Sequence, residues 1–144
     1  MEATSEIVNI LGGPNVLGKK IASESDFLAA IQRGLPYRAV ERIKQRLKLT
    51  DGELVQSINI HPRTLIRRKS EQRLRSDESD RLSRLARVSA RAIDVLGSEQ
   101  NAVRWLRQPN GALGGASPLS YLKTDVGARR VESILSHIDY GDVS

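Results

Sequence analysis

Hydrophobic residues recur at intervals of three and four positions along most of the chain, which is the spacing of one face of an α-helix. The sets expected to face inward are Ile7, Val8 and Leu11; Phe27, Leu28 and Ile31; Val40, Ile43 and Leu47; Leu82, Leu85, Ala86, Ala92, Ile93 and Leu96; Ala102, Val103 and Leu106; and Val126, Val131, Ile134, Leu135 and Ile138. No segment alternates convincingly with the period of a β-strand. The pattern therefore predicts an all-α fold.

Residues that favour helix ends lie between these sets. The expected starts are at Ser23 or Ser25, Pro36, Ser76, Ser98 and Thr124, and the expected ends are at Gly12, Gly34, Gly97, Pro109 and Gly141. Residues 110–115, NGALGG, are rich in glycine. They follow no predicted strand and precede no Lys-Ser/Thr pair, so they are interpreted as a tight connector and not as a phosphate-binding loop.

Residues 50–69, TDGELVQSINIHPRTLIRRK, contain the features of two short helices joined by a sharp turn. Thr50 and Glu53 form an S/T-x-x-E capping box, in which each side chain can bind a free backbone N–H of the first helix. Asn59 tolerates the left-handed backbone that a sharp turn requires. Pro62 suits the first position of the second helix, because its missing N–H has no helical partner there. The segment therefore predicts a helix-turn-helix.

In a DNA-binding helix-turn-helix, the second helix lies in the major groove and its exposed side chains contact base edges. Here Leu65 and Ile66 are expected to face inward. The predicted DNA contacts are Arg63, Thr64 and Arg67 at bases, Arg68, Lys69 and Arg73 at phosphates, and His61 in addition to its role as a helix cap. A single motif of this size makes a small interface, so a dimer on two half-sites is expected.

Positive charge is concentrated in the same part of the chain. Residues 36–75 carry eleven Lys or Arg and four Asp or Glu, a net charge of +7 within a total of +6. Residues 1–35 carry −1, and residues 76–144 are neutral. Such a patch attracts phosphate backbones through counterion release, which favours double-stranded DNA as a partner. For any single arginine, a solvated helix face is the alternative.

Four further arginines lie on the long helix predicted to begin at Ser76. They are Arg81, Arg84, Arg87 and Arg91. Asp77 and Arg81, and likewise Asp80 and Arg84, have the i, i+4 spacing and orientation that stabilise a helix. The interpretation is a solvated, ion-paired face that does not contact DNA.

Composition argues against several other classes of protein. The chain contains no Cys, which excludes disulfides and thiolate metal sites and fits a reducing cytoplasm. No apolar run is long enough to span a bilayer, and the acidic N-terminal segment does not have the order of a secretory signal. Five aromatic residues are too few for a base-stacking platform. His61 and His137 lie far apart and no catalytic motif is present, so we expect no enzyme, metal site or cofactor.

Several short motifs, taken in order, carry a resemblance to a known family. They are Leu11-Gly12-Gly13, Gly34-Leu35-Pro36, the basic helix-turn-helix, Ala102-Val103-Arg104-Trp105-Leu106, Pro109-Asn110, Leu113-Gly114-Gly115, Pro118-Leu119 and Thr124-Asp125-Val126-Gly127, followed by Val131, Leu135 and Gly141. Over nearly all of its length, the chain resembles the Xre-type antitoxins of bacterial toxin–antitoxin pairs. Two residues depart from the usual helix-turn-helix, since Arg68 stands at an apolar position and Asn59 replaces the turn glycine.

The resemblance implies a Cro/repressor-like helix-turn-helix domain over residues 1–75 and a small helical toxin-binding domain over residues 76–144. It implies that the chain neutralises a partner toxin, commonly a RES-domain toxin that degrades NAD, and represses its own operon. The implied partners are that toxin, operator DNA and a second copy of the chain within a hetero-oligomer, without a membrane. The alternative is a plain dimeric repressor whose C-terminal half dimerises or senses a ligand.

The C-terminal half carries no net charge, so contact with a toxin is expected to use an apolar patch. The candidates are Trp105, Leu113, Leu119 and Tyr121, and packing in the core is the alternative for each. The acidic tail, Asp139-Tyr140-Gly141-Asp142 with the last two residues, is expected to obstruct a toxin site built for the phosphates of NAD. The alternative for the tail is a frayed terminus.

Overall fold

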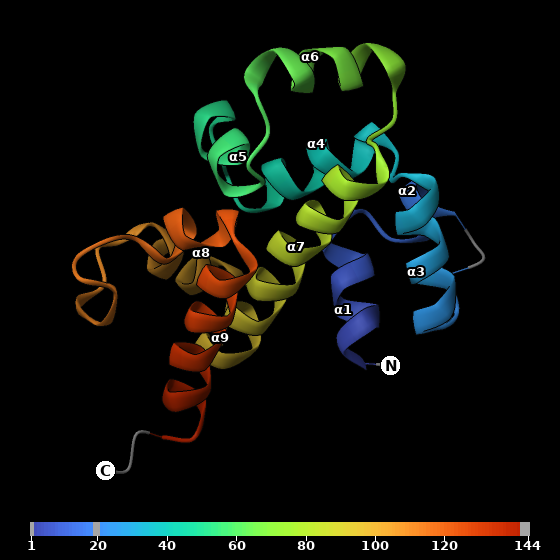
Figure 1. The fold of residues 1–144 in the computed structure, drawn as a ribbon. Coiled ribbons are helices and arrows are strands. Elements are labelled where there is room, and N and C mark those ends of the chain that lie inside the picture. The colour runs from blue at the N-terminus through green and yellow to red at the C-terminus, as the bar shows by residue number, and fades with distance from the viewer. Residues whose placement is uncertain (1, 19–20, 142–144) are drawn as a thin grey trace.

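Helices form most of the part of the chain that the structure, a computed structural model, describes: residues 2–18 and 21–141 (Figure 1). The α-helices are α1 (Glu2–Ile10), α2 (Pro14–Leu17), α3 (Glu24–Arg33), α4 (Tyr37–Arg46), α5 (Asp51–Ser57), α6 (Pro62–Glu71), α7 (Ser76–Leu96), α8 (Glu99–Arg107) and α9 (Asp125–Asp139), and the 3₁₀ helices are η1 (Gly111–Leu113) and η2 (Pro118–Lys123). Pro36 and Arg73 form an isolated bridge, and no strand occurs in the described ranges. The predicted all-α fold is confirmed.

Serine and threonine side chains begin four helices, as the sequence predicts. In each case the hydroxyl oxygen accepts a hydrogen bond of 3.0–3.1 Å from the backbone N–H three residues later. The four residues are Ser23, Thr50, Ser98 and Thr124. Ser23, and not Ser25, therefore begins α3. α7 starts at Ser76 and ends before Gly97, whose φ of 89° is the left-handed conformation of a helix C-cap.

The glycine-rich segment 110–115 folds back on Asn110. The carbonyl of Asn110 accepts hydrogen bonds from the N–H groups of Leu113 (3.0 Å) and Gly115 (2.9 Å), and its side chain accepts one from Ala112 (2.9 Å). The segment is therefore the tight connector that the sequence predicts. The sequence pattern does not predict α2, because four residues are too few to show a helical repeat.

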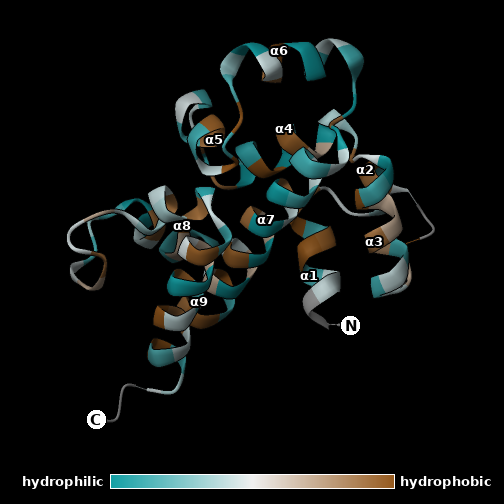
Figure 2. Ribbon diagram, viewed as in Figure 1, coloured by the Kyte–Doolittle hydropathy of each residue, from teal (hydrophilic) through white to brown (hydrophobic). Residues whose placement is uncertain are grey.

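α7 is the longest helix and lies at the centre of the fold (Figure 1). α1, α3, α8 and α9 pack against it, while η2 packs against α5, α8 and α9. The buried Leu82 and Leu85 of α7 belong to one core with Leu54 and Leu135, so the core includes both halves of the chain. Figure 2 shows that α6, at the upper edge, is mainly hydrophilic. The division after residue 75 stays a prediction, since α7 contacts elements on both sides of it.

The segment that follows α6 is fixed to the residues before α4. The Tyr37 N–H donates to the Gln72 carbonyl (3.1 Å), and the Leu74 N–H donates to the Leu35 carbonyl (2.9 Å). Gly34 is required at this joint, because its φ is 96° and a Cβ there would lie 2.1 Å from the carbonyl oxygen of Leu74. Both ends of the α4–α6 unit are therefore held together.

Four large hydrophobic side chains that the pattern assigns to the core are exposed, so these predictions are wrong. Their exposed fractions are 55% for Leu28, 69% for Ile66, 79% for Val126 and 38% for Ile138. The first two directly follow a residue that faces the core, Phe27 or Leu65, and are rotated by about 100° from it. The other two lie in the first and last turns of α9, outside the span of its buried residues, 127–135.

Candidate functional site

Helices α5 and α6 form the predicted helix-turn-helix. Its capping box is complete, since the Thr50 N–H donates to Glu53 Oε1 (2.9 Å) and the Glu53 N–H donates to Thr50 Oγ1 (3.1 Å). Asn59 occupies the turn with a φ of 51°. Nδ1 of His61 accepts a hydrogen bond from the N–H of Arg63 (3.1 Å), so His61 caps α6 as predicted.

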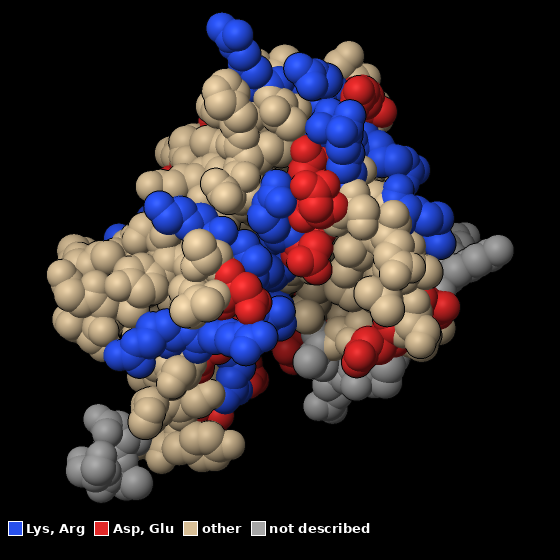
Figure 3. Space-filling view, viewed as in Figure 1, with Lys and Arg blue, Asp and Glu red and all other residues tan. Residues whose placement is uncertain are grey.

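The outer face of α6 is cationic. Arg63, Arg67 and Lys69 are exposed, and no ion pair within residues 2–18 and 21–141 involves them. In Figure 3, Lys and Arg side chains gather along the upper edge of the molecule, where α6 lies. Thr64 is half-buried at the side of the helix. Arg73 follows α6 and is exposed, and its Nη1 donates to the Gly34 carbonyl (2.6 Å). This face can therefore approach the negative phosphates of a duplex.

Arg68 does not lie on this face, so its predicted contact with phosphate is wrong. Its side chain is buried, its Nε donates to Glu78 Oε1 (2.7 Å), and its Nη1 lies 3.2 Å from Glu71 Oε1. The hydrogen bond with Glu78 raises the pKa of Arg68. The same Glu78 oxygen accepts the N–H of Arg75 (2.8 Å), at the start of α7. Leu65 and Arg68 are three residues apart and share the inward face, where α7 supplies the opposite charge.

Ile66 takes a position on the outer face, which reasoning from the sequence missed. The exposure of Ile66 could have been predicted from the helical period, because an inward Leu65 places residue 68 inward and residue 66 outward. Ile66 also lines a groove of about 330 Å³ between α4, α5 and α6, together with Val55 and Lys69.

Charged groups and one tyrosine lie along that groove. Lys44 and Asp51 form an ion pair, and the hydrogen bond from Lys44 lowers the pKa of Asp51. Burial raises the pKa of the Tyr37 hydroxyl. Lys44 and Asp51 are thus paired within the protein, whereas Glu41 and Lys69 of the same lining belong to no ion pair in the described ranges.

The arginines of α7 connect this helix to other elements. Arg81 forms the predicted ion pair with Asp77 (3.4 Å), but its Nε also donates to the Ile58 carbonyl at the end of α5 (2.7 Å). Arg87 donates two hydrogen bonds to the carboxylate of Glu132 in α9 (3.0 and 3.1 Å). The predicted solvated face is therefore a set of contacts between helices.

Arg84 contradicts the predicted pairing with Asp80. The guanidinium is buried, which lowers the pKa of Arg84, and it donates to the carbonyls of Leu122 (3.2 Å) and Lys123 (3.1 Å). These carbonyls lie at the end of η2, where a 3₁₀ helix leaves acceptors without partners. Arg84 therefore satisfies the end of η2 and holds it against α7.

A second contact joins α5 to the C-terminal half. Nε and Nη2 of Arg107 donate to the two carboxylate oxygens of Glu53 (3.0 and 2.8 Å), and Nη2 also donates to the Lys48 carbonyl. Burial raises the pKa of the Glu53 carboxyl, but hydrogen bonds from Arg107 and from the Thr50 backbone outweigh it, so the pKa of Glu53 lies below its usual range. Glu53 therefore takes part in the capping box of α5 and is also bound by Arg107 of α8.

Two of the four apolar side chains predicted to contact a toxin lie in the core. Leu113 and Leu119 are 5% and 6% exposed, so they cannot form a surface patch. Trp105 and Tyr121 are half-buried against the same core. Leu119 belongs to η2, which α9 approaches closely, since a Cβ on Gly127 would lie 2.0 Å from the Tyr121 carbonyl oxygen. The half-buried rings are the candidates that still reach the surface.

The predicted C-terminal tail is partly helical, because α9 extends to Asp139. The carboxylate of Asp139 lies 3.0 Å from Nη2 of Arg91, so this residue of the predicted tail is held against α7. Tyr140 is 78% exposed and Gly141 follows it at the surface. Asp142 and the last two residues lie outside the described ranges.

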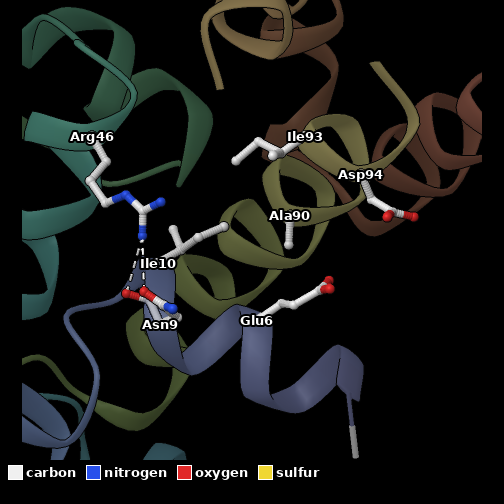
Figure 4. Close-up of a pocket in the computed structure, with 7 residues that line it drawn as sticks. All are labelled: Glu6, Asn9, Ile10, Arg46, Ala90, Ile93 and Asp94. Atoms are coloured by element: carbon white, nitrogen blue, oxygen red, sulfur yellow. Dashed lines mark hydrogen bonds between the residues drawn. The ribbon is translucent and has the colours of Figure 1, made fainter. Parts of the chain in front are cut away.

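A pocket of about 230 Å³ lies between α1, α4 and α7 (Figure 4). Arg46 lines it and donates to the carbonyl and side-chain oxygens of Asn9 (3.4 and 3.2 Å) and to Glu99 (2.8 Å). This cation is therefore already satisfied. Within the part of the chain that the structure describes, no three acidic or histidine side chains gather as a metal site, and no helix is long and apolar enough to cross a membrane.

Family models match both halves of the chain. Residues 26–87 match the Antitoxin Xre-like helix-turn-helix domain, which contains α5 and α6. Residues 91–141 match the Antitoxin Xre/MbcA/ParS C-terminal toxin-binding domain. The first match ends and the second begins within α7, with residues 88–90 between them.

Named proteins with similar sequences align with most of the chain. The chain is 35% identical over 123 residues to "Antitoxin Xre" of Pseudomonas putida. This alignment covers 85% of this chain and 76% of the relative. It is 32% identical over 118 residues to "Antitoxin Xre" of Photorhabdus laumondii (81% and 80%) and 25% identical over 130 residues to the "Prs ADP-ribosylating antitoxin" of a Sphingobium (83% and 82%). The chain belongs to the Xre family of antitoxins, with a DNA-binding helix-turn-helix domain followed by a toxin-binding domain.

Proposed function

We propose that this antitoxin blocks the active site of a RES-type toxin that degrades NAD, and that it represses its own operon as a dimer on promoter DNA. The observation that carries the DNA-binding part is the outer face of α6, where Arg63 and Arg67 are exposed and form no ion pair in the described ranges. The toxin-binding part is supported by the domain match over residues 91–141.

On DNA, residues 1–75 would read one half-site and the second copy would read the other. Arg63, Thr64 and Arg67 would face bases, with His61 beside them. Lys69 and Arg73 would contact phosphates. Arg68 has no place in this set, because it is bound by Glu78 inside the protein.

Replacing Arg67 by Ala tests the assignment of the recognition face. We expect the affinity for the operator to fall by about 1–3 kcal/mol and the preference at one base pair to be relaxed. Fluorescence anisotropy on the DNA upstream of the operon and on a scrambled duplex measures both quantities. Arg104→Ala is the matched control, because Arg104 is exposed on α8, away from α6. Parental discrimination by the Arg67 variant would remove the assignment.

On the toxin, residues 76–144 would contribute the half-buried rings of Trp105 and Tyr121, the exposed Tyr140 and Gly141, and the residues that follow them in the sequence. The tail is proposed to obstruct the site that binds the phosphates of NAD. One relative carries a name that refers to ADP-ribosylation, which is a reaction that also consumes NAD. A toxin of that class is therefore the second candidate partner.

Purification with the neighbouring gene product tests the antitoxin role. We expect an untagged toxin to copurify with the tagged chain and its NAD hydrolysis to be inhibited. Deletion of residues 140–144 should restore part of that activity, whereas Asp139→Asn, which alters only the pair with Arg91, should not. Full inhibition by the shortened chain would remove the tail from the proposal. A homodimer without a partner would favour the plain repressor that dimerises or senses a ligand.

A further inference from the structure

Ile66 is an exposed aliphatic side chain in the middle of a cationic helix face. Its exposed fraction of 69% leaves most of its hydrocarbon in water, while the next residue in the chain, Arg67, is also exposed. Burial of such a side chain against a ligand is favourable, because it removes apolar surface from water. The position of Ile66 therefore points to an apolar group on whatever α6 contacts.

The neighbours of Ile66 define what that contact can be. Arg63 lies three residues before it and Ser70 four residues after it, which are the spacings of adjacent side chains on one helix face. Both are exposed. Leu65 and Arg68, by contrast, face the protein. Ile66 thus shares its surface with polar and cationic groups suited to a duplex, and the inference rests on the proposed binding of operator DNA.

The major groove offers one apolar group among the four unmodified bases. Thymine presents its 5-methyl group there, whereas the groove edges of adenine, guanine and cytosine present hydrogen-bonding atoms. We infer that Ile66 reads thymine through contact with this methyl group, at a base pair adjacent to one contacted by Arg63 or Arg67. Arginine suits the O6 and N7 acceptors of guanine, so the two residue types would read neighbouring base pairs of different identity.

The groove beside Ile66 supplies the competing explanation. Its lining includes Val55 and Leu65, so an aliphatic side chain of a second copy of the protein could cover Ile66 instead. The charge of the outer face favours DNA over a contact in which both copies use this face, because that contact would bring Arg63, Arg67 and Lys69 of the two copies together. Thymine recognition and contact between copies give different experimental results.

The test begins with selection of binding sequences from a random duplex library by the protein of residues 1–144. The preferred thymines are then replaced one at a time by deoxyuridine, which removes only the 5-methyl group. We expect one such replacement to weaken binding by the parent about fourfold, the factor for one buried methyl group. Ile66→Ala should bind the thymine and uracil duplexes equally and should no longer select thymine at that position.

Leu28→Ala is the matched control, because Leu28 is an exposed aliphatic residue of α3, 55% accessible and outside the helix-turn-helix. It should retain the full discrimination between thymine and uracil. Equal binding of both duplexes by the parent would overturn the inference that Ile66 reads thymine. The same discrimination in the parent and in Ile66→Ala would also overturn it. Neither result would count against the proposed binding of operator DNA. Failure of the parent to enrich any sequence overturns operator binding and this inference together. Dissociation of the dimer by Ile66→Ala, measured by light scattering, would assign Ile66 to contact between copies instead.

Discussion

The arginines of α6 and those of α7 differ in whether their guanidinium groups bind other parts of the protein. Arg63 and Arg67 on α6 are exposed, and neither belongs to an ion pair in the described ranges. On α7, Arg84 caps carbonyls of η2 and Arg87 binds Glu132 of α9. The density of positive charge along a helix therefore does not reveal a binding face. What distinguishes the two helices is whether acceptors from other elements lie within reach of the guanidinium groups.

Arg68 is the exception on α6 and gives the largest expected effect. Arg68→Ala would leave the buried Glu78 carboxylate without its partner, which should lower the free energy of unfolding by about 3 kcal/mol. Urea denaturation measures this change. The double variant Arg68→Met with Glu78→Gln should recover most of the loss, because it leaves no unpaired charge in the interior and keeps an acceptor for the N–H of Arg75. If Arg68→Ala is as stable as the parent, Arg68 belongs with the exposed arginines after all.

Arg84 tests the other side of the comparison. Arg84→Ala removes the donor from two carbonyls that pack against α7, and we expect a loss of about 2 kcal/mol in the free energy of unfolding. Arg104→Ala on α8 is the control and should change stability by less than about 0.5 kcal/mol, as an exposed side chain without a partner in the described ranges does. Equal effects of the two changes would contradict the capping role of Arg84.

The Glu53–Arg107 pair links the two halves and should make a smaller, pH-dependent contribution. The pKa of Glu53 is lower in the folded protein than in the unfolded chain, so its carboxylate stabilises the fold above the unfolded value of about 4.3. This contribution is lost as the pH falls through the folded pKa. Glu53→Gln keeps the capping box but removes the charge. Urea unfolding should show a loss of about 0.5–1 kcal/mol at pH 6 that shrinks progressively as the pH is lowered below the unfolded value.

The exposed arginines of α6 should have the smallest effect on stability. We expect Arg63→Ala and Arg67→Ala each to change the free energy of unfolding by less than about 0.5 kcal/mol. Lys69→Ala, which removes a proposed phosphate contact, should likewise leave stability unchanged but should reduce the salt dependence of DNA binding by about one counterion. Titrations of DNA at several salt concentrations separate the two readouts. A large loss of stability in either variant would place that arginine with those of α7.

Local features could be predicted from the sequence, and contacts between distant residues could not. The capping box of Thr50 and Glu53 depends on residues three positions apart, so its pattern is visible in the chain. The partners of Arg84 lie 38 and 39 positions away, and Arg107 lies 54 positions from Glu53. Those pairs depend on how whole helices pack. For Leu113 and Leu119 the sequence left surface and core both open, because segments as short as these 3₁₀ helices show no helical repeat that would decide between them.

The pair formed by Arg68 and Glu78 has a practical consequence for hybrid proteins. A chimaera that joins residues 1–75 to a foreign regulatory module would omit Glu78, and with it the carboxylate that pairs with the buried Arg68 of α6. The backbone N–H of Arg75 would lose its acceptor in the same cut. A splice point after the first three turns of α7 preserves both bonds, and Arg81 keeps its hold on the carbonyl of Ile58.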